Sequence, residues 1–488
     1  MAGIVSYGAY LPRLRLERMG IMMSMGWFAP GLITAAQGER TMCNWDEDSV
    51  TMAVAASRDC LVGMDKAKID GLHLATTSPP FADRSSAGIL SEALNLKDEI
   101  ASADFTSTQK AGTSALTAAL SAVKSGDRSC VLVTASDHRR TKAAWFHEMW
   151  FGDGAASLLI GDGNVIAEYL GGFSVTHDFL DHYRGLDEKF DYNWEERWIR
   201  DEGYMKIYAQ AIGGLLKKTG VAPADVAKFV YPCFLGRAHG DIGKKLGAKP
   251  EQLAGSMHAE TGECGTAHPL LMLVRELEKA KPGDKIVVAG FGQGSDALLF
   301  QVTDKIKNLP ARMGVAGALA RKKSDKTYTR YLKFNDLITT ETGIRSESVK
   351  QTALTTLWRH HKMILGFVGG KCTKCGTPQI PKQRICVKPG CEAVDTQVDY
   401  EFADQPAKIL TYTSDMLAVS MDPPAMYGMV EFVNGGRMMM DFTDCSAEDV
   451  EVGVPVKVSF RKKYFDEKRG FTGYFWKAVP DKSGAVKA

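Results

Sequence analysis

Residues 104–120 read "DFTSTQKAGTSALTAAL". The stretch starts as the end of an apolar strand, passes through a short polar turn and continues as a helix of Ala, Gly, Ser and Thr. Side chains this small allow another segment to approach the helix backbone, and the first turn of a helix presents N–H groups that lack helical partners. The stretch therefore predicts a strand–turn–helix unit with Gln109 at the turn.

The rest of the first 310 residues alternates between short apolar strands and amphipathic helices. Expected strands lie at 131–137, 155–163, 228–234 and 285–300, and expected helices include 48–62 and 268–280. This alternation predicts an α/β architecture with mostly buried sheets. Residues 306–330 are basic and poor in strand formers, so we expect a connector and a helix there rather than part of a core.

From Cys372 onward the sequence changes to short runs of branched and aromatic residues broken by Gly, Asn and Pro, which is typical of an all-β module. The module opens with a CxxC pair and a CxxxxC pair, which can direct four thiolates at one tetrahedral centre. The expected ligands of a structural zinc ion are Cys372, Cys375, Cys386 and Cys391. Four unconnected thiols are the alternative. Four cysteine ligands leave no open position, so we expect no catalysis at this metal.

Composition narrows the range of partners. The formal charge of +2 gives no electrostatic reason to expect nucleic acid or an anionic membrane surface. No apolar run reaches the roughly 18–20 residues that span a bilayer, and the first residues lack the features of a signal peptide. Ten cysteines in 488 residues do not make a disulfide scaffold. We therefore expect a reduced, cytoplasmic protein.

Three glycine-containing turns recur beside expected strands, at 109–115, 151–163 and 290–300. None matches a Walker or dinucleotide-binding pattern, and a single such loop is weak evidence for a phosphate site. Glycine turns can also aim backbone N–H groups at one point and so build an oxyanion hole. The glycines expected to bind substrate in this way are Gly112, Gly152, Gly292 and Gly294.

Five motifs occur in the order seen in HMG-CoA synthases, which resemble ketoacyl-ACP synthase III and belong to the thiolase superfamily. They are "NWDEDSVTMAV" (44–54), "DFTSTQKAGTSAL" (104–116), "FGDGAASLLIG" (151–161), "FSVTHDFLDHYRG" (173–185) and "GFGQGSDALLF" (290–300). The resemblance covers roughly residues 1–345, and the remainder is similar to the zinc-ribbon/OB module that accompanies several thiolase-like enzymes.

The resemblance implies a thiolase-like five-layered αβαβα fold, followed by a C-terminal zinc ribbon and an all-β OB-fold barrel. It also implies an acyl-CoA thioester as substrate, with coenzyme A as part of that substrate, and a homodimer formed through the thiolase-like domain. The expected domains are two thiolase-like halves at 1–165 and 166–345, a linker with the zinc ribbon at 346–400, and the OB fold at 401–488.

The catalytic residues of the family do not carry over to this chain. Gln109 stands at the position of the nucleophilic cysteine, and Thr77, in "LATTSPP", stands at that of the general-base glutamate. Pro232 occupies the position of the histidine, and Glu263 that of the asparagine. Thr77 is then expected to contact the substrate.

Other side chains near these positions could replace the lost chemistry. Cys233 and Cys264 each lie one residue from a catalytic position, although a small buried hydrophobe is the usual role of such a cysteine. The segment "HAETGECGTAH" brings His268 and Glu263 together as acid–base candidates, and His239 is a further one. The basic run at 139–142 offers groups for the phosphates of coenzyme A, but a solvated edge is the simpler expectation.

An acyl-enzyme needs a thiolate, so the missing cysteine disfavours acyl transfer. Aldol chemistry needs only a base, donors for the enolate oxygen and a proton donor. We therefore expect an aldol or retro-aldol enzyme acting on a β-hydroxyacyl-CoA. The alternatives are condensation or acyl transfer through Cys233 or Cys264, a decarboxylase, and a non-catalytic scaffold whose OB module contacts a pathway enzyme.

Overall fold

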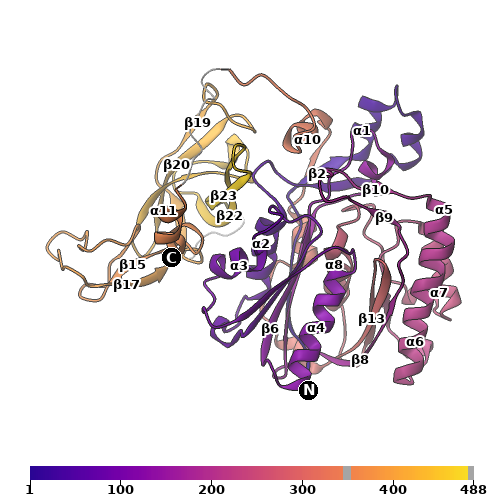
Figure 1. Ribbon diagram of the computed structural model, residues 1–488. Helices are drawn as coiled ribbons and strands as arrows, with labels where there is room; N and C mark the ends of the chain where they lie inside the picture. The colour runs from indigo at the N-terminus through magenta and orange to yellow at the C-terminus, as the bar shows by residue number, and fades with distance from the viewer. Residues whose placement is uncertain (344–352, 482–488) are drawn as a thin grey trace. The chain divides into compact units, whose positions relative to one another are not determined.

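The computed structural model describes residues 1–343 and 353–481 and divides the chain into two compact units (Figure 1). The first unit comprises residues 1–44, 48–90 and 96–338. The second comprises 45–47, 91–95 and the chain from 339 onward. The expected domain boundary between residues 345 and 346 lies outside the described residues.

The first unit is organised around a nine-stranded sheet with the order β11-β12-β13-β8-β1-β7-β6-β4-β5. Its strands are β1 (Gly3–Tyr10), β4 (Gly71–Ala75), β5 (Ala101–Phe105), β6 (Cys130–Asp137), β7 (Gly154–Gly161), β8 (Ala167–Thr176), β11 (Lys228–Val230), β12 (Lys285–Phe291) and β13 (Gly294–Val302). Parallel pairs lie at both ends of the sheet, and antiparallel pairs join them through the middle. Strand β11 is shorter than expected, because Pro232 has no N–H to continue the ladder.

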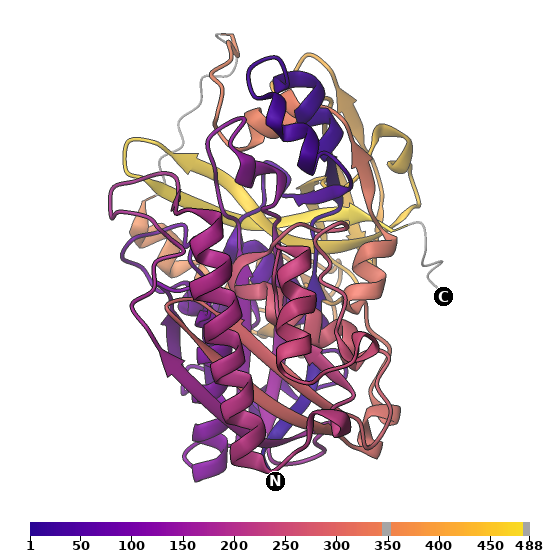
Figure 2. The same cartoon turned by 90° about the vertical axis from the view of Figure 1, so that its right-hand side faces the viewer.

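Helices cover both faces of this sheet and fill the space between its two halves. Helices α4 (Ala111–Ser125) and α8 (His268–Leu277) share one core with strands from both halves. Helix α2 (Ser49–Cys60) packs on β1, β6 and β7, and α6 (Ala209–Thr219) packs on β8, β12 and β13. Figure 2 shows α6 in front of the strands. The two halves of the nine-stranded sheet thus form two separate layers. The order of layers is helix, sheet, helices, sheet and helix, as expected for a thiolase-like fold.

Shorter elements complete the first unit. They are β2 (Leu14–Glu17), β3 (Glu39–Met42), β9 (His182–Tyr183), β10 (Tyr192–Asn193), β14 (Lys323–Asp325), α1 (Arg18–Met25), α3 (Ser86–Ala93), α5 (Glu196–Trp198), the π-helix η4 (Ile199–Tyr208), α7 (Gly236–Lys245), α9 (Gly314–Ala320) and α10 (Tyr328–Phe334). The expectation of a connector outside the core is wrong for α9. Val315 and Ala318 are fully buried in the same core as α4 and α8, because residues three apart lie on the same face of a helix and this face turns toward the core.

The second unit contains a small three-stranded sheet and a larger all-β sheet. Their strands are β15 (Val368–Cys372), β16 (Pro378–Gln379) and β17 (Gln397–Glu401), then β18 (Ala407–Ile409), β19 (Thr413–Asp415), β20 (Ala425–Phe432), β21 (Arg437–Asp441), β22 (Pro455–Asp466) and β23 (Phe471–Pro480). Two short helices precede them, α11 (Leu354–Arg359) and α12 (His361–Ile364). A bridge between Phe442 and Ala478 links the end of β21 to β23, which curls the larger sheet toward a barrel.

Buried charges hold the early segment 45–47 within this unit. Asp46 is fully buried, and its carboxylate lies 2.8 Å from Nζ of Lys477. Burial alone would raise the pKa of Asp46, but Lys477 and Arg461 together bring it below its ordinary value.

Among the described helices, none is both long enough and apolar enough to cross a bilayer.

Candidate active site

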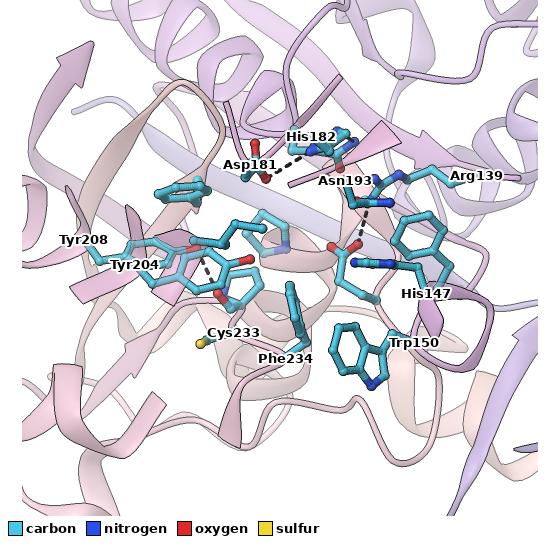
Figure 3. A pocket seen from close by; sticks show the side chains of 18 residues that line it. Arg139, His147, Trp150, Asp181, His182, Asn193, Tyr204, Tyr208, Cys233 and Phe234 are labelled. Atoms are coloured by element: carbon cyan, nitrogen blue, oxygen red, sulfur yellow. Dashed lines mark hydrogen bonds and ion pairs between the residues drawn. The ribbon is translucent and has the colours of Figure 1, made fainter. Parts of the chain in front are cut away.

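A cavity with about 670 Å³ of empty space, part of it open to solvent, lies within the first unit (Figure 3). Several segments line it, and together they bring polar and aromatic side chains. Polar side chains come from Gln109, Arg139, His147, Asp181, His182, Asn193 and Glu263, and aromatic ones from Trp150, Phe151, Tyr204, Tyr208, Phe234 and Phe291.

Asp137, the last residue of β6, organises the floor of this cavity. Its carboxylate accepts hydrogen bonds from Thr77 N at 2.7 Å, Thr77 Oγ1 at 3.1 Å and Thr266 N at 2.8 Å. Gly265 lines the cavity at a φ of +57°, and a Cβ there would come within 2.3 Å of Asp137 Oδ2. One buried carboxylate thus fixes the loops that carry Thr77 and Glu263.

Gln109 lies just before helix α4 and points its amide along this floor. Its Nε2 donates to Thr77 Oγ1 at 3.2 Å and lies 3.4 Å from Nε2 of His182. The side chain therefore connects the loop anchored by Asp137 to the hairpin formed by β9 and β10.

Buried ion pairs hold that hairpin over the cavity. Arg139 pairs with Asp191 at 2.7 Å and with Glu263 at 3.0 Å, while its guanidinium lies 3.8 Å from the centre of the Phe151 ring. Arg184 pairs with the second oxygen of Asp191 at 2.9 Å. Burial alone would raise the pKa of Asp191, but Arg139 and the other nearby cations bring it below its ordinary value. The expectation that the basic run forms a solvated edge is wrong for Arg139, which is only 5% exposed.

Two histidines lie in the cavity with different surroundings. His182 Nδ1 lies 3.0 Å from the carboxylate of Asp181 (Figure 3). His147 contacts Trp150 and Phe234 edge-on, and burial, reinforced by Arg139, lowers its pKa to about 4. His147 is therefore neutral at physiological pH, and His182 is the histidine with a carboxylate partner.

Four buried polar atoms of the lining have no hydrogen-bond partner among the described residues. They are Gln109 Oε1, His147 Nδ1, Asp181 Oδ1 and Asn193 Nδ2. An unpaired buried polar atom costs about 1–3 kcal/mol, so several at one cavity mark a place that a polar ligand completes.

Gln109 and Glu263 line the cavity, whereas the two expected histidines do not. His268 is fully buried, accepts from Cys264 N at 3.1 Å and donates to the Ser256 carbonyl at 2.8 Å. Both of its ring nitrogens thus brace the loop that carries Glu263. His239 belongs to helix α7. Its ring packs against the ring of Tyr231, outside the cavity lining.

The four glycines expected to bind substrate lie outside the lining and serve close packing. A Cβ at Gly112 would come within 2.3 Å of the Thr266 carbonyl, and one at Gly152 within 1.9 Å of the Thr261 carbonyl. A Cβ at Gly294 would come within 2.1 Å of the Val175 carbonyl. A Cβ at Gly292 would come within 2.8 Å of the backbone nitrogens of residues 109 and 110, so a glycine here leaves room for the turn that presents Gln109.

The two candidate cysteines differ in their access to the cavity. Cys233 lines it, but burial raises the pKa of its thiol to about 12, and its sulfur donates to the Leu235 carbonyl at 3.4 Å. Cys264 is fully buried outside the lining, and burial raises its pKa further. Neither thiol has the electropositive, accessible surroundings of a reactive cysteine.

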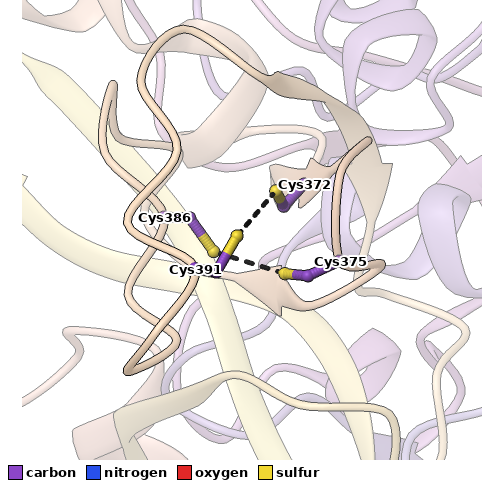
Figure 4. A group of neighbouring side chains, drawn as sticks. All are labelled: Cys372, Cys375, Cys386 and Cys391. Atoms are coloured by element: carbon purple, nitrogen blue, oxygen red, sulfur yellow. Dashed lines mark hydrogen bonds between the residues drawn. The ribbon is translucent and has the colours of Figure 1, made fainter.

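The four ribbon cysteines come together in the second unit (Figure 4). All four sulfurs lie within 4.8 Å of one another, with Cys372 and Cys391 at 3.9 Å and Cys375 and Cys386 at 3.5 Å. Zn–S bonds of about 2.3 Å in a tetrahedron separate the sulfurs by about 3.8 Å. The geometry therefore fits a four-thiolate zinc site.

Comparison with known proteins agrees with this architecture. A model described as the C-terminal part of 3-oxoacyl-[acyl-carrier-protein (ACP)] synthase III matches residues 216–300, and one described as the ChsH2 C-terminal OB-fold domain matches 400–461. The hydroxymethylglutaryl-CoA synthase of Methanobrevibacter smithii is 31% identical over 350 residues, which are 69% of this chain and 99% of that protein. The synthase of Caldivirga maquilingensis is 30% identical over 345 residues, 69% of this chain and 98% of its own.

The chain belongs to the hydroxymethylglutaryl-CoA synthase family. A solved HMG-CoA synthase complexed with CoA superimposes with a TM-score of 0.61 at 19% identity, covering 72% of this chain and 95% of that chain. The HMG synthase of the curacin biosynthetic pathway superimposes with a TM-score of 0.60 at 19% identity, covering 69% and 88%. At this identity the two structures establish the fold of this synthase-family member.

Sequence reasoning missed the hairpin residues of this synthase-family site. Asp181 and His182 lie in "FSVTHDFLDHYRG", a motif that the sequence analysis used only as a marker of the family. An adjacent Asp–His pair at an expected turn was the available signal. Nothing local to the sequence indicates that Arg139 and Arg184 meet at Asp191, because Arg139 lies 52 residues before Asp191 in the chain.

Proposed function

We propose that the cavity catalyses aldol-type formation or cleavage of a carbon–carbon bond in a β-hydroxyacyl-CoA, without an acyl-enzyme intermediate. The observation that carries this proposal is Gln109, which lies at the cavity floor at the position where the family resemblance places a cysteine. A carboxamide is neither nucleophilic nor titratable, so it binds and orients but accepts no acyl group. Family membership supports acyl-CoA thioesters as the substrates.

The polar side of the cavity offers what aldol chemistry needs. Asn193 carries an unpartnered buried N–H group, which can donate to a thioester enolate oxygen. Preorganised donors of this kind are worth roughly 3 kcal/mol each to such a transition state. Glu263 is held by Arg139 and lies in the same lining, where its carboxylate can accept a hydrogen bond from the hydroxyl of the substrate.

An aromatic groove adjoins the cavity and indicates the nature of the acyl group. Its lining shares His147, Trp150, Ile199 and Phe234 with the cavity and adds Trp145, Phe146, Trp194 and Glu196. Aromatic surfaces of this kind gain free energy by taking apolar area out of water. We therefore propose that the part of the substrate beyond the β-carbon is bulky and apolar.

A second candidate is condensation of the HMG-CoA synthase type through a displaced cysteine. The family relationship supports it more directly, since the matched relatives carry the name of a condensing synthase, and Cys233 lines the cavity. The raised thiol pKa of Cys233 weighs against it, because only about one thiol in 10⁵ is ionised at pH 7 when the pKa is near 12.

One experiment separates these candidates. The purified protein is incubated with 3-hydroxyacyl-CoA esters of increasing apolar size, products are identified by mass, and intact-protein mass is recorded in parallel. We expect a carbonyl compound and a shorter acyl-CoA with unmodified protein. A Cys233 adduct would replace the first candidate with the second, and no turnover with any ester, in either direction, would favour the scaffold.

We further propose that Cys372, Cys375, Cys386 and Cys391 hold one structural zinc ion and that the first unit forms a homodimer. Four thiolates close the zinc coordination shell, so the ion would fix the ribbon and leave no position for substrate. A reducing compartment such as the cytoplasm would keep these thiols available. Metal analysis and light scattering on freshly purified protein test the two statements.

A further inference from the structure

The family position of the histidine is Pro232 in this chain, yet an imidazole faces the same cavity from a different element. It belongs to His182, in the hairpin of β9 and β10. We propose that Asp181 and His182 form the proton-transfer dyad of this site, with His182 Nε2 as the atom that takes and returns the proton. The inference rests on the proposed aldol-type function and names the acid–base group for it.

The hydrogen-bond chain across the floor determines which ring nitrogen carries the lone pair. The single hydroxyl hydrogen of Thr77 is donated to Asp137, so Thr77 Oγ1 can only accept from Gln109. The atom of Gln109 that faces Thr77 is therefore its NH₂ group, and this group also faces His182 Nε2 at 3.4 Å. His182 Nε2 is then an acceptor, and Nδ1–H donates to Asp181 at 3.0 Å.

This tautomer suits a general base, since Nε2 lies in the cavity lining with only the long 3.4 Å contact from Gln109 on its lone pair, and the carboxylate stabilises the imidazolium that forms. Burial alone would raise the pKa of Asp181, but His182 and then Arg139 bring it below its ordinary value, so the carboxylate stays ionised. The other ionisable groups of the lining and its ion pairs are His147, Arg139, Arg184, Asp191, Glu263, Tyr204, Tyr208 and Cys233.

The unpartnered atoms around the dyad point independently to a ligand at this place. Asp181 Oδ1 and Gln109 Oε1 are buried acceptors, and Asn193 Nδ2 is a buried donor. Asn193 pairs with His182 in the hairpin register, so the donor lies beside the base. A β-hydroxyacyl thioester brings one hydroxyl donor and one carbonyl acceptor, which match these groups.

The reaction balances without a co-reactant. In the cleavage direction His182 Nε2 takes the β-hydroxyl proton, the oxygen electron pair forms the carbonyl, and the Cα–Cβ bond breaks. Its electrons pass to Cα and the thioester oxygen as an enolate, which Asn193 stabilises. The imidazolium then delivers the same proton to Cα, giving the shorter acyl-CoA and restoring His182.

The test compares His182→Gln with His177→Gln, whose histidine is exposed and bonded to Gln210 outside the cavity. In the full-length protein we expect His182→Gln to lower turnover of a 3-hydroxyacyl-CoA by about 10²- to 10⁴-fold and His177→Gln to leave it unchanged. Added imidazole should restore part of the activity of His182→Ala, a readout that a purely structural role would not give. Asp181→Asn should lower turnover and shift the acidic limb of the pH profile to lower pH, while Asp178→Asn should change neither.

A second readout keeps the dyad testable if no carbon–carbon cleavage is found. Wild-type protein incubated with acetyl-CoA or propionyl-CoA in D₂O should incorporate deuterium at Cα, because this exchange needs only the base and the enolate donors. His182→Gln should lose the exchange. Exchange that persists in His182→Gln, or its absence from wild type, overturns the dyad, whereas exchange in wild type without cleavage of any ester overturns the proposed function alone.

Discussion

The cysteine ribbon and the acyl cavity are both sites of converging side chains, but they are held together in opposite ways. The ribbon brings together four cysteines from residues 372–391, and its sheet has only three short strands. The cavity takes its lining from residues 109–291, already fixed by a large sheet, a buried carboxylate and a network of ion pairs. We therefore expect the ribbon to depend on a bound metal for its structure, whereas the cavity is held by the sheet and its own ion pairs.

The largest effect is expected from breaking the ribbon. Structural zinc contributes about 10–16 kcal/mol of apparent binding free energy in small zinc-binding peptides, so Cys375→Ser should remove the metal and unfold residues around 372–401. Metal analysis should find about one zinc ion per chain in wild type and almost none in the variant. Cys445→Ser, a half-buried cysteine of the same unit outside the cluster, serves as the control and should keep its zinc. Wild-type protein without zinc would remove the contrast between the two sites.

The cavity should instead fail through its own charges. Arg139→Met leaves Asp191 and Glu263 without their buried partner, and breaking such a pair typically costs 3–5 kcal/mol. We expect a corresponding fall in the urea midpoint of the first unit, with zinc content unchanged. Arg140→Met, at the half-buried neighbouring position, should change stability by no more than about 0.5 kcal/mol. Equal effects of the two variants would show that the ion network does not hold the cavity.

This contrast also explains what the sequence could predict. The strand–turn–helix unit around Gln109 and the four ribbon ligands depend on short-range spacing, and the structure has both as expected. Glu263 was identified because its loop resembles that of a family. His182 contacts Gln109 because the hairpin that carries it is anchored through Arg184 and Asp191. No periodicity in the sequence predicts this long-range contact. The sequence places His268 five residues after Glu263 and so suggests an acid–base pair. In the structure the ring of His268 hydrogen-bonds to backbone atoms instead.

A buried carboxyl near the cavity makes the stability of the first unit depend on pH. Burial raises the pKa of Glu148 from 4.5 to about 7, although Tyr328 donates to it at 2.8 Å. The native state therefore favours the protonated acid, so this contribution is fully present below about pH 4.5 and is lost as pH rises through 7. Glu148→Gln should remove that loss and be more stable than wild type at pH 8 by about 2–3 kcal/mol. At pH 4.5 the two proteins should be alike, and a variant no more stable than wild type at pH 8 would contradict the assignment.

The smallest effect, and the sharpest test of the cavity, is expected at Gln109. Gln109→Met keeps the size of the side chain but removes the donor to Thr77 Oγ1 and His182 Nε2, two neutral hydrogen bonds of the kind worth about 0.5–1.5 kcal/mol each. We expect kcat/KM to fall about 10-fold with folding and zinc content unchanged, because the amide orients the dyad and takes no part in bond making.

Gln109→Cys provides the complementary change, since it places a thiol at the start of α4 beside His182, where a thiolate is favoured. Incubation of Gln109→Cys with acetyl-CoA should then add one acetyl group at residue 109, visible by mass, while wild type stays unmodified. A loss of 10³-fold or more in Gln109→Met would mean that the carboxamide itself stabilises the transition state. Acetylation of the wild-type protein would instead support acyl transfer through a cysteine.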